Sequence, residues 1–474
     1  MRNTFRLLSL LLLAFVSVQT PAATAPADSS ATKQTCDNTP TTYHYRVAFK
    51  NKENNTYTLK RPYEFLSQKA LDRRLKYGIK VDEHDLPVTP VYLSYLSSRG
   101  LRVISSSKWN NTAVVETSDT ALVNSLLAVT FVESVRRVGE KHNNTATDDS
   151  YDRKKEVVDS CDELSNYYGH AETQVKMIGV DKLHHAGYTG KDITIAVIDG
   201  GFLNTDCIAG LDSVRILGTH NFVDPSVSVY EGHPHGTMVL SCIAANRPNS
   251  LVGTAPDASF YLLVSEYGPT EYMVEEDFWC AALEYADSAG VDIVTSSLGY
   301  YAFDDSINTH KYYELDGETA VNSHAASMAA SRGLLLLNSA GNSGDEEWKK
   351  IGFPGDAKNI LTVGAVTEDG TNTVFSSVGN TADGRIKPDV MAMGEYTWLF
   401  DKTGSVSEAN GTSFSTPLMA GGVACLLEAF PDKTPEEIIS AVQRAGNNAA
   451  HPDNIYGYGI PDLWKAYNLL QTTK

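Results

Sequence analysis

The chain has 474 residues, which is enough for two or three domains of roughly 100–200 residues each. Apolar residues make up 42% of it and charged residues 20%, a composition typical of a soluble globular protein. The 58 acidic side chains outnumber the 39 basic ones and give a formal charge of −19. This balance argues against nucleic acid as a partner, because phosphate binding requires a basic face.

The N-terminus is predicted to be a secretory signal peptide. Arg2 and Arg6 precede the only long apolar run, residues 7–18, and small residues follow it. This run is shorter than the roughly 20 residues that cross a bilayer. We therefore expect residues 1–27 to be removed on export, leaving a mature protein that is extracellular or periplasmic and not membrane-bound. An uncleaved N-terminal anchor is the alternative.

Residues 43–139 are predicted to form a small α+β domain, because their apolar positions follow strand and helix periodicities in turn. The expected strands are residues 43–50, 102–105, 112–116 and 132–138, and the expected helices are residues 63–77 and 120–127. Residues 140–164 then have hardly an apolar side chain before Val157. Such a segment buries too little surface to fold, so we expect a solvated linker that tolerates a proteolytic cut.

After this linker, short and almost continuous apolar runs alternate with helical segments. The expected strands are residues 193–198, 260–264, 291–294, 334–337 and 360–363, and two of the expected helices are residues 276–289 and 320–331. Runs with little polar alternation suit strands covered on both faces, and their alternation with helices predicts a doubly wound, mostly parallel α/β sheet flanked by helices. In such sheets the functional residues lie beyond the carboxyl ends of the strands.

Four segments near those ends carry reactive or hydrogen-bonding side chains. They are Asp199-Gly200-Gly201, Gly232-His233-Pro234-His235-Gly236-Thr237-Met238-Val239, Ser339-Ala340-Gly341-Asn342-Ser343-Gly344 and Asn410-Gly411-Thr412-Ser413-Phe414-Ser415-Thr416-Pro417. A serine hydroxyl becomes a nucleophile when a base lies within hydrogen-bond reach and a third group orients that base. Ser413 is therefore the candidate nucleophile, His235 the candidate base and Asp199 the candidate orienting group.

The negative charge formed in such a reaction needs hydrogen-bond donors. The first N–H groups of a helix have no partner, so the Ser413 N–H and the Asn342 side chain are the candidate oxyanion donors. Each residue also has an ordinary interpretation when taken singly. Asp199 suits a turn, Asn342 suits a loop and Ser413 suits a helix N-cap. His235 suits a surface histidine or, with His233, half of a metal site.

In the order Asp, His, Asn, Ser, the four segments resemble the motifs of the subtilisin-like serine proteases, D-[ST]-G, H-G-T-x-V, A-G-N and G-T-S-x-[AS]-x-P. Gly200 departs from this pattern by replacing the usual hydroxyl residue, and Phe414-Ser415 stands where Met-Ala is commoner. Gly421-Gly422, in the helix after Ser413, is expected to pack closely against the sheet. The resemblance covers residues 169–470 and implies a subtilisin-like catalytic domain at 165–474.

The resemblance also implies an organisation and a function. Residues 28–142 look like the inhibitory propeptide of the family, a ferredoxin-like α+β domain, and residues 143–164 look like a linker that contains or adjoins the processing site. The implied protein is a secreted serine endopeptidase that processes its own zymogen, with proteins or peptides and its own propeptide as partners. A catalytically inactive, peptide-binding protein of the same fold is the alternative. An α/β-hydrolase does not fit, because G-x-S-x-G is missing and the order of the triad differs.

Two segments match the substrate-binding edges of the family. They are Ser297-Leu298-Gly299 on one side of the expected cleft and Ala340-Gly341 on the other, where an extended peptide adds as a strand. The aromatic and acidic residues of 300–318 either line the pockets or cover the sheet. The family requires no cofactor for catalysis. Its members often bind structural calcium, but no D-x-[DN]-x-[DN]-G loop is present and no metal ligand is assigned.

Overall fold

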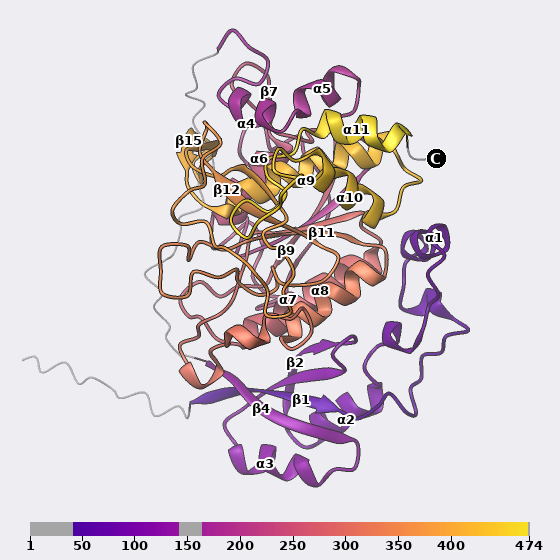
Figure 1. Cartoon of the computed structure of the whole chain (residues 1–474). Coiled ribbons are helices and arrows are strands. Elements are labelled where there is room, and N and C mark those ends of the chain that lie inside the picture. Colours follow the sequence, from indigo (N-terminus) through magenta and orange to yellow (C-terminus); the bar gives the residue numbers. More distant parts are fainter. Residues whose placement is uncertain (1–40, 142–163, 473–474) are drawn as a thin grey trace, which may run out of the picture. The chain divides into compact units, whose positions relative to one another are not determined.

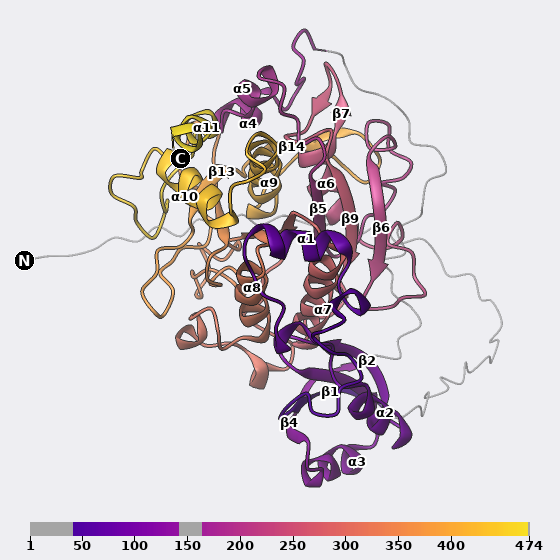
Figure 2. The ribbon, with the colours of Figure 1, turned by 90° about the vertical axis from the view of Figure 1, so that its right-hand side faces the viewer.

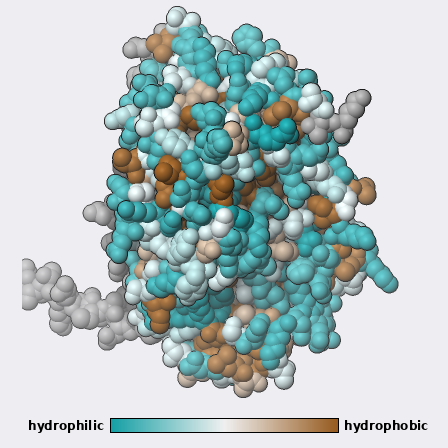
Figure 3. Space-filling view, viewed as in Figure 1, coloured by the Kyte–Doolittle hydropathy of each residue, from teal (hydrophilic) through white to brown (hydrophobic). Residues whose placement is uncertain are grey.

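The computed structural model describes residues 41–141 and 164–472. The predicted signal peptide and nearly all of the predicted linker lie outside these residues. Within the described ranges, none of the helices combines the length and the apolar character needed to cross a membrane. The face drawn in Figure 3 is mostly hydrophilic, with hydrophobic residues scattered singly or in small groups, which is ordinary for a protein surface.

The N-terminal domain is a four-stranded antiparallel sheet with helices, which confirms the predicted α+β class (Figure 1). Its elements are β1 (Thr42–Phe49), α1 (Gln68–Lys76), α2 (Pro90–Ser98), β2 (Arg102–Ser107), β3 (Thr112–Thr117), α3 (Thr120–Ser125) and β4 (Val132–Lys141). The strand order is β2-β3-β1-β4. Neighbouring residues of β3 face opposite ways. Val115 belongs to the same buried cluster as Leu96 of α2, whereas Val114 belongs to that of Phe278 in the next domain.

Two helices of this domain differ from the prediction. α1 begins at Gln68 and not at residue 63, because the Ser67 hydroxyl accepts a hydrogen bond from the Ala70 N–H at 3.1 Å and caps the helix there. A 3-10 turn, η1 (Pro62–Glu64), precedes it. α2 was not predicted at all. It contains no charged side chain, so its sequence lacks the contrast between polar and apolar faces by which a surface helix is recognised.

The second domain is built on a seven-stranded sheet in which every neighbouring pair is parallel, and this confirms the doubly wound class. The order is β13-β12-β11-β10-β5-β9-β6. The strands are β5 (Thr194–Asp199), β6 (Arg215–Asn221), β9 (Ser259–Val264), β10 (Ile293–Ser296), β11 (Leu335–Ser339), β12 (Leu361–Val366) and β13 (Val390–Met393). The two edge strands were not predicted. β6 has no buried residue, so it lacks the continuous apolar run by which the other strands are recognised.

Helices cover both faces of this sheet (Figure 1 and Figure 2). They are α6 (His235–Ala244) and α9 (Thr412–Ala429) on one face, and α7 (Val274–Ala289) and α8 (Val321–Ser331) on the other. Val197 of β5 shares a buried cluster with Val239 of α6, whereas its neighbour Ile198 shares one with Leu283 of α7. Because both faces are covered, the central strands are buried at every position from end to end, and most of their residues are apolar.

The remaining elements surround this core. They are α4 (Glu172–Met177), α5 (Val180–His185), β7 (Asn246–Arg247), β8 (Leu251–Val252), β14 (Thr397–Phe400), β15 (Val406–Ala409), α10 (Pro435–Ala445), α11 (Leu463–Thr472), and the 3-10 turns η2 (Glu83–Asp85), η3 (Leu126–Ala128), η4 (Ser306–Asn308) and η5 (Tyr312–Glu314).

A Cβ on Gly421 would lie 2.0 Å from Thr254 Oγ1, and one on Gly422 would lie 2.3 Å from Leu463 Cδ1. The close packing expected of these glycines is present, but its partners are a loop and α11 and not the sheet.

Candidate active site

Two of the four predicted segments, and one of the predicted substrate-binding segments, leave adjacent strands at the carboxyl ends of the sheet. Asp199 is the last residue of β5, Ser297 follows β10, and Asn342 lies three residues beyond β11. β10 pairs with β5 on one side and with β11 on the other, so the three exits are neighbours. The chain continues from β5 toward one edge of the sheet and from β10 toward the other. This is the switch point at which doubly wound sheets form their binding crevice.

His235 and Asp199 form a hydrogen-bonded pair. The Nδ1 of His235 lies 2.8 Å from Asp199 Oδ1, and Asp199 is completely buried. His235 is held there by the start of α6, where the Gly236 N–H donates to the Gly201 carbonyl at 2.9 Å. A Cβ on Gly236 would lie 2.5 Å from that oxygen, so only glycine permits this approach. Burial alone lowers the pKa of His235, but the Asp199 carboxylate outweighs it and raises the pKa above the ordinary value.

The environment of Asp199 reflects one departure from the family motif. Its Oδ1 also accepts the Gly200 N–H at 2.8 Å, while its Oδ2 has no hydrogen-bond partner among the described residues. Gly200 stands where the family usually has a hydroxyl side chain, which is the kind of donor a buried carboxylate oxygen takes. Asp199 is therefore oriented by one oxygen only.

Ser413 is fixed by a reciprocal contact with Ser297. Pro417, four residues later in α9, has no N–H, so the Ser413 carbonyl lacks its helical partner. The Ser297 hydroxyl donates to that carbonyl at 2.8 Å instead, and the Ser413 hydroxyl donates to the Ser297 carbonyl at 3.3 Å. Ser413 is largely buried, at 8% exposed, and it lines the cavity described below.

The Asn342 side chain is oriented by Thr412. The Asn342 Oδ1 accepts hydrogen bonds from both the N–H and the hydroxyl of Thr412, each at 2.9 Å. The Thr412 hydroxyl also accepts the Gly341 N–H at 3.2 Å, which ties the end of β11 to the start of α9. With its oxygen occupied, the Asn342 amide has its nitrogen left to donate.

A cavity of about 330 Å³ collects most of the predicted site residues. Its lining includes Asp199, His235, Ser297, Leu298, Gly299, Gly341, Asn342 and Ser413. Ala340 does not line it. That residue is fully buried, its N–H donates to the Val363 carbonyl, and its own carbonyl accepts the Gly352 N–H. Of the stretch 300–318, Tyr301 lines the cavity, while Tyr300 is buried.

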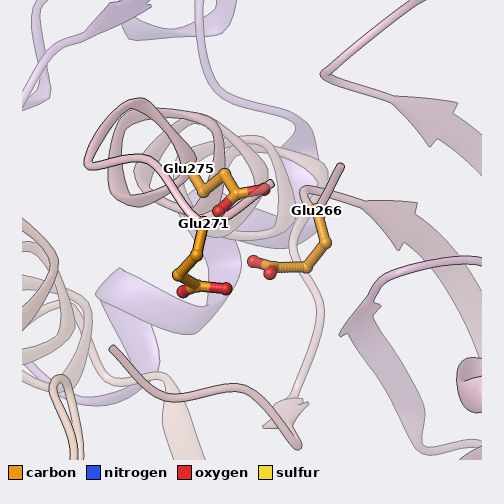
Figure 4. A group of neighbouring side chains, drawn as sticks. All are labelled: Glu266, Glu271 and Glu275. Carbon is orange, nitrogen blue, oxygen red and sulfur yellow. The ribbon is translucent and has the colours of Figure 1, made fainter. Parts of the chain in front are cut away.

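Sequence reasoning missed an acidic group on the wall of this cavity. Glu266 and Glu271 line it, and Glu275 lies behind them in the first turn of α7. One carboxylate oxygen from each lies within 4.8 Å of the others, and Figure 4 shows the three side chains converging. We call Glu266, Glu271 and Glu275 the acidic wall. Glu266 follows β9, so the rule applied to the other strand exits would have pointed to it.

A buried serine at a helix start, beside an aspartate–histidine pair at the edge of a parallel sheet, is the arrangement of a serine hydrolase. The sequence profile of the Subtilase family matches residues 190–459, more than half of the chain, and the chain belongs to this family. The profile of the Peptidase S8 propeptide domain of Bacteroidota matches residues 44–155. The protein is therefore a subtilisin-type serine endopeptidase that carries a propeptide domain.

Known relatives agree with this assignment. Subtilisin DY of Bacillus licheniformis is 26% identical over 290 residues, covering 60% of this chain and 94% of the relative. Serine protease AprX of Bacillus subtilis is 27% identical over 343 residues, covering 64% and 74%. The crystal structure of the epidermin leader peptide processing serine protease of Staphylococcus aureus has the same fold, with a TM-score of 0.62 at 16% identity over 91% of this chain and 99% of that one.

Proposed function

We propose that this subtilase cleaves peptide bonds with Ser413 as the nucleophile, His235 as the general base and Asp199 as the group that orients His235. We also propose that it is exported and that it removes its own propeptide. The observation that carries the proposal is the 2.8 Å hydrogen bond between His235 and Asp199, in the cavity that Ser413 and Asn342 also line. A catalytically inactive protein has no need of this pair.

In the proposed reaction, the Ser413 hydroxyl first turns away from the Ser297 carbonyl, to which it now donates. It then attacks the scissile carbonyl carbon while its proton passes to the Nε2 of His235. The imidazolium formed is stabilised by Asp199 at Nδ1. His235 next protonates the leaving amine, and a water molecule, deprotonated by the same ring, releases the acyl group from Ser413.

The negative charge on the attacked carbonyl oxygen is proposed to be stabilised by the Ser413 N–H and the Asn342 Nδ2. Support comes from the two Thr412 bonds to Asn342 Oδ1, which fix the amide so that no reorganisation is needed during the reaction. An extended peptide is proposed to pair with residues 297–299 and with Gly341, which line the same cavity. Ala340 is omitted from this role because both of its backbone groups are already bonded.

The N-terminal domain is proposed to act as a folding aid and an inhibitor until the linker is cut. Support comes from its contacts with α7. Arg46 donates two hydrogen bonds to Asp277, each at 2.7 Å. The backbone N–H groups of Lys108 and Trp109 donate to Glu284 at 2.7 and 3.1 Å. These groups are buried, so the contact is specific for charge as well as shape.

Expression of the Ser413→Ala chain tests the proposal. We expect it to accumulate as a precursor that retains residues 28–163 and does not cleave a peptide substrate, whereas the wild type is processed and active. Ser415→Ala is the matched control, because Ser415 lies on the same helix and alanine is usual there in the family. Normal processing of Ser413→Ala in a protease-free host contradicts self-cleavage, and an inactive wild type supports the peptide-binding alternative.

A further inference from the structure

The acidic wall shares the catalytic cavity. Glu266 and Glu271 line the same 330 Å³ space as Ser413 and His235, so a peptide held for attack at Ser413 passes them. Glu266 lies directly beside the exit of β5, since a Cβ placed on Gly200 would be 3.5 Å from the Glu266 Cβ. Figure 4 shows that the three carboxylates are directed toward one another.

One member of the wall is buried with an unused acceptor. Glu275 is only 2% exposed; its Oε1 accepts the Tyr267 N–H at 2.8 Å, and its Oε2 has no hydrogen-bond partner among the described residues. Figure 4 shows this side chain directed into the group. A buried carboxylate oxygen without a donor costs free energy, which a bound cationic donor removes.

Among the described residues, the cavity that the wall lines contains neither lysine nor arginine. Burial, followed by the Asp304 carboxylate, raises the pKa of Glu271 to about 7. Burial and the neighbouring carboxylates also hold the pKa values of Glu266 and Glu275 well above the ordinary range. The wall therefore retains protons near neutral pH, and a cation bound beside it would stabilise the ionised carboxylates.

We propose that the acidic wall binds a lysine or arginine side chain of the substrate and so makes the enzyme selective for peptides with a basic residue near the scissile bond. This inference rests on the proposed function, because it assumes that substrate is attacked at Ser413. An ammonium or guanidinium group brings several N–H donors to the unpaired Oε2 of Glu275 and to the Glu271 carboxylate beside it. Because Glu275 is buried, this pairing is screened less than one at the surface and favours a charged side chain over an uncharged one.

A substrate side chain fits the wall better than a metal ion does. The Tyr300 hydroxyl donates to Glu266, and the Tyr267 N–H donates to Glu275. These bonds leave fewer carboxylate oxygens free than the roughly six to eight ligands that a calcium ion takes, whereas an ammonium group needs only about three acceptors. The sequence offers a natural occupant: in residues 143–164 the only basic side chains are Arg153, Lys154 and Lys155, and the propeptide profile ends at residue 155.

The test is a peptide series that carries Lys, Arg, Met or Glu at each position in turn around one cleavable bond. For the processed wild-type enzyme, we expect kcat/KM to be about tenfold higher with Lys or Arg than with Met at one position. Glu271→Gln is expected to remove most of that ratio, with the Lys or Arg peptide and the Met peptide compared in the same variant. Glu231→Gln is the matched control, since Glu231 is an exposed acid just before His233 that does not line the cavity.

The outcomes separate the two proposals. Hydrolysis of the Met peptide by the wild type but not by Ser413→Ala supports the proposed function whatever the ratio is. A kcat/KM ratio of the Lys or Arg peptide to the Met peptide that is near one at every position overturns the inference. An equal loss of this ratio in Glu231→Gln also overturns it, because the preference then comes from long-range charge only. The series is repeated with added Ca²⁺. A ratio abolished by Ca²⁺ and restored by its removal assigns the wall to the metal and contradicts the basic side chain as its resident partner.

Discussion

Helix α7 carries carboxylates toward two different neighbours, and only one neighbour supplies positive charge. Toward the propeptide domain, Asp287 accepts hydrogen bonds from Lys108 Nζ at 3.0 Å and from Arg74 Nη2 at 2.9 Å, and it also pairs with Arg73. Toward the catalytic cavity, Glu275 and the rest of the acidic wall meet no cation among the described residues.

The pKa values follow this difference. Burial works to raise the pKa of Asp287, but Lys108, Arg73 and Arg74 outweigh it and hold the pKa well below the usual range. In the acidic wall burial acts together with further carboxylates, and the pKa of Glu271 rises to about 7. Buried acids that pair with basic side chains of the propeptide domain, such as Asp287, therefore hold the two domains together. The acids of the acidic wall, which have no such pair among the described residues, indicate a cationic partner that is not part of the chain.

The largest effect is expected at Asp199. This carboxylate lines the same cavity as the acidic wall, but it has a partner within the chain, His235. Asp199→Asn is expected to lower kcat by about 10⁴, since the amide no longer holds the correct tautomer of His235 or stabilises its cation. The measurement is kcat on a neutral peptide. Glu231→Gln, the same acid-to-amide change at an exposed residue that does not line the cavity, is the control and should leave that rate within about twofold. Equal losses in both variants contradict separate roles for these acids.

Neutralising a carboxylate is expected to change the stability of the precursor in opposite directions at the contact between α7 and the propeptide domain and at the acidic wall. Asp287→Asn leaves Arg73, Arg74 and Lys108 buried with too little negative charge and should destabilise the precursor by about 3 kcal/mol. Glu271→Gln relieves repulsion and should be neutral or stabilising. Both changes are made in the Ser413→Ala chain, so that processing does not interfere, and thermal unfolding is recorded. A loss of stability in both variants breaks the comparison.

The acidic wall is expected to cost stability as the pH rises. The unfolded Glu271 carboxyl ionises near its ordinary pKa of 4.5, whereas the folded one ionises near 7. The folded state therefore holds more protons between these values, and its stability falls by about 2 kcal/mol as the pH rises from 4.5 to 7. In the Ser413→Ala background, the stability gained by adding Glu271→Gln should be larger at pH 8 than at pH 5. An equal gain at both pH values contradicts the raised pKa.

Replacement of the linker's basic residues gives the smallest expected effect. Changing Arg153, Lys154 and Lys155 to Gln removes the only lysines and arginines of residues 143–164. If the acidic wall receives this segment during self-cleavage, processing should slow severalfold, as expected for losing one or two charge-assisted hydrogen bonds. A pulse-chase of precursor and mature chain measures the rate. An unchanged rate shows that the processing site lies elsewhere in the linker, and it limits the inference to external substrates.

Much of the catalytic fold was predictable, because strands that are covered on both faces have runs of apolar residues in the sequence. β6 has no such run, since it forms an edge of the sheet and its residues alternate between exposed and half-buried. Asp199, His235, Asn342 and Ser413 were singled out because each lies in a short motif with fixed neighbours, and the structure places all four on one cavity, while their catalytic roles stay a proposal.

The charged surfaces were not predictable, and the reason is sequence separation. Arg74 and Asp287 are 213 residues apart, and nothing near either one indicates that the other neutralises it. The acidic wall was missed for a different reason. Residues 266–271 have the glycine, proline and acidic side chains of an ordinary surface loop, and only the pairing of β9 with β5 brings them to the cavity.

Labelling with a fluorophosphonate tests the central claim most directly, because such reagents phosphonylate a serine only when a neighbouring base activates it. The processed chain is treated with the reagent, digested and mapped by mass spectrometry. The account predicts one label, on Ser413, and a strongly reduced labelling rate in Asp199→Asn. An unlabelled processed chain, or a label on any other serine, would contradict it.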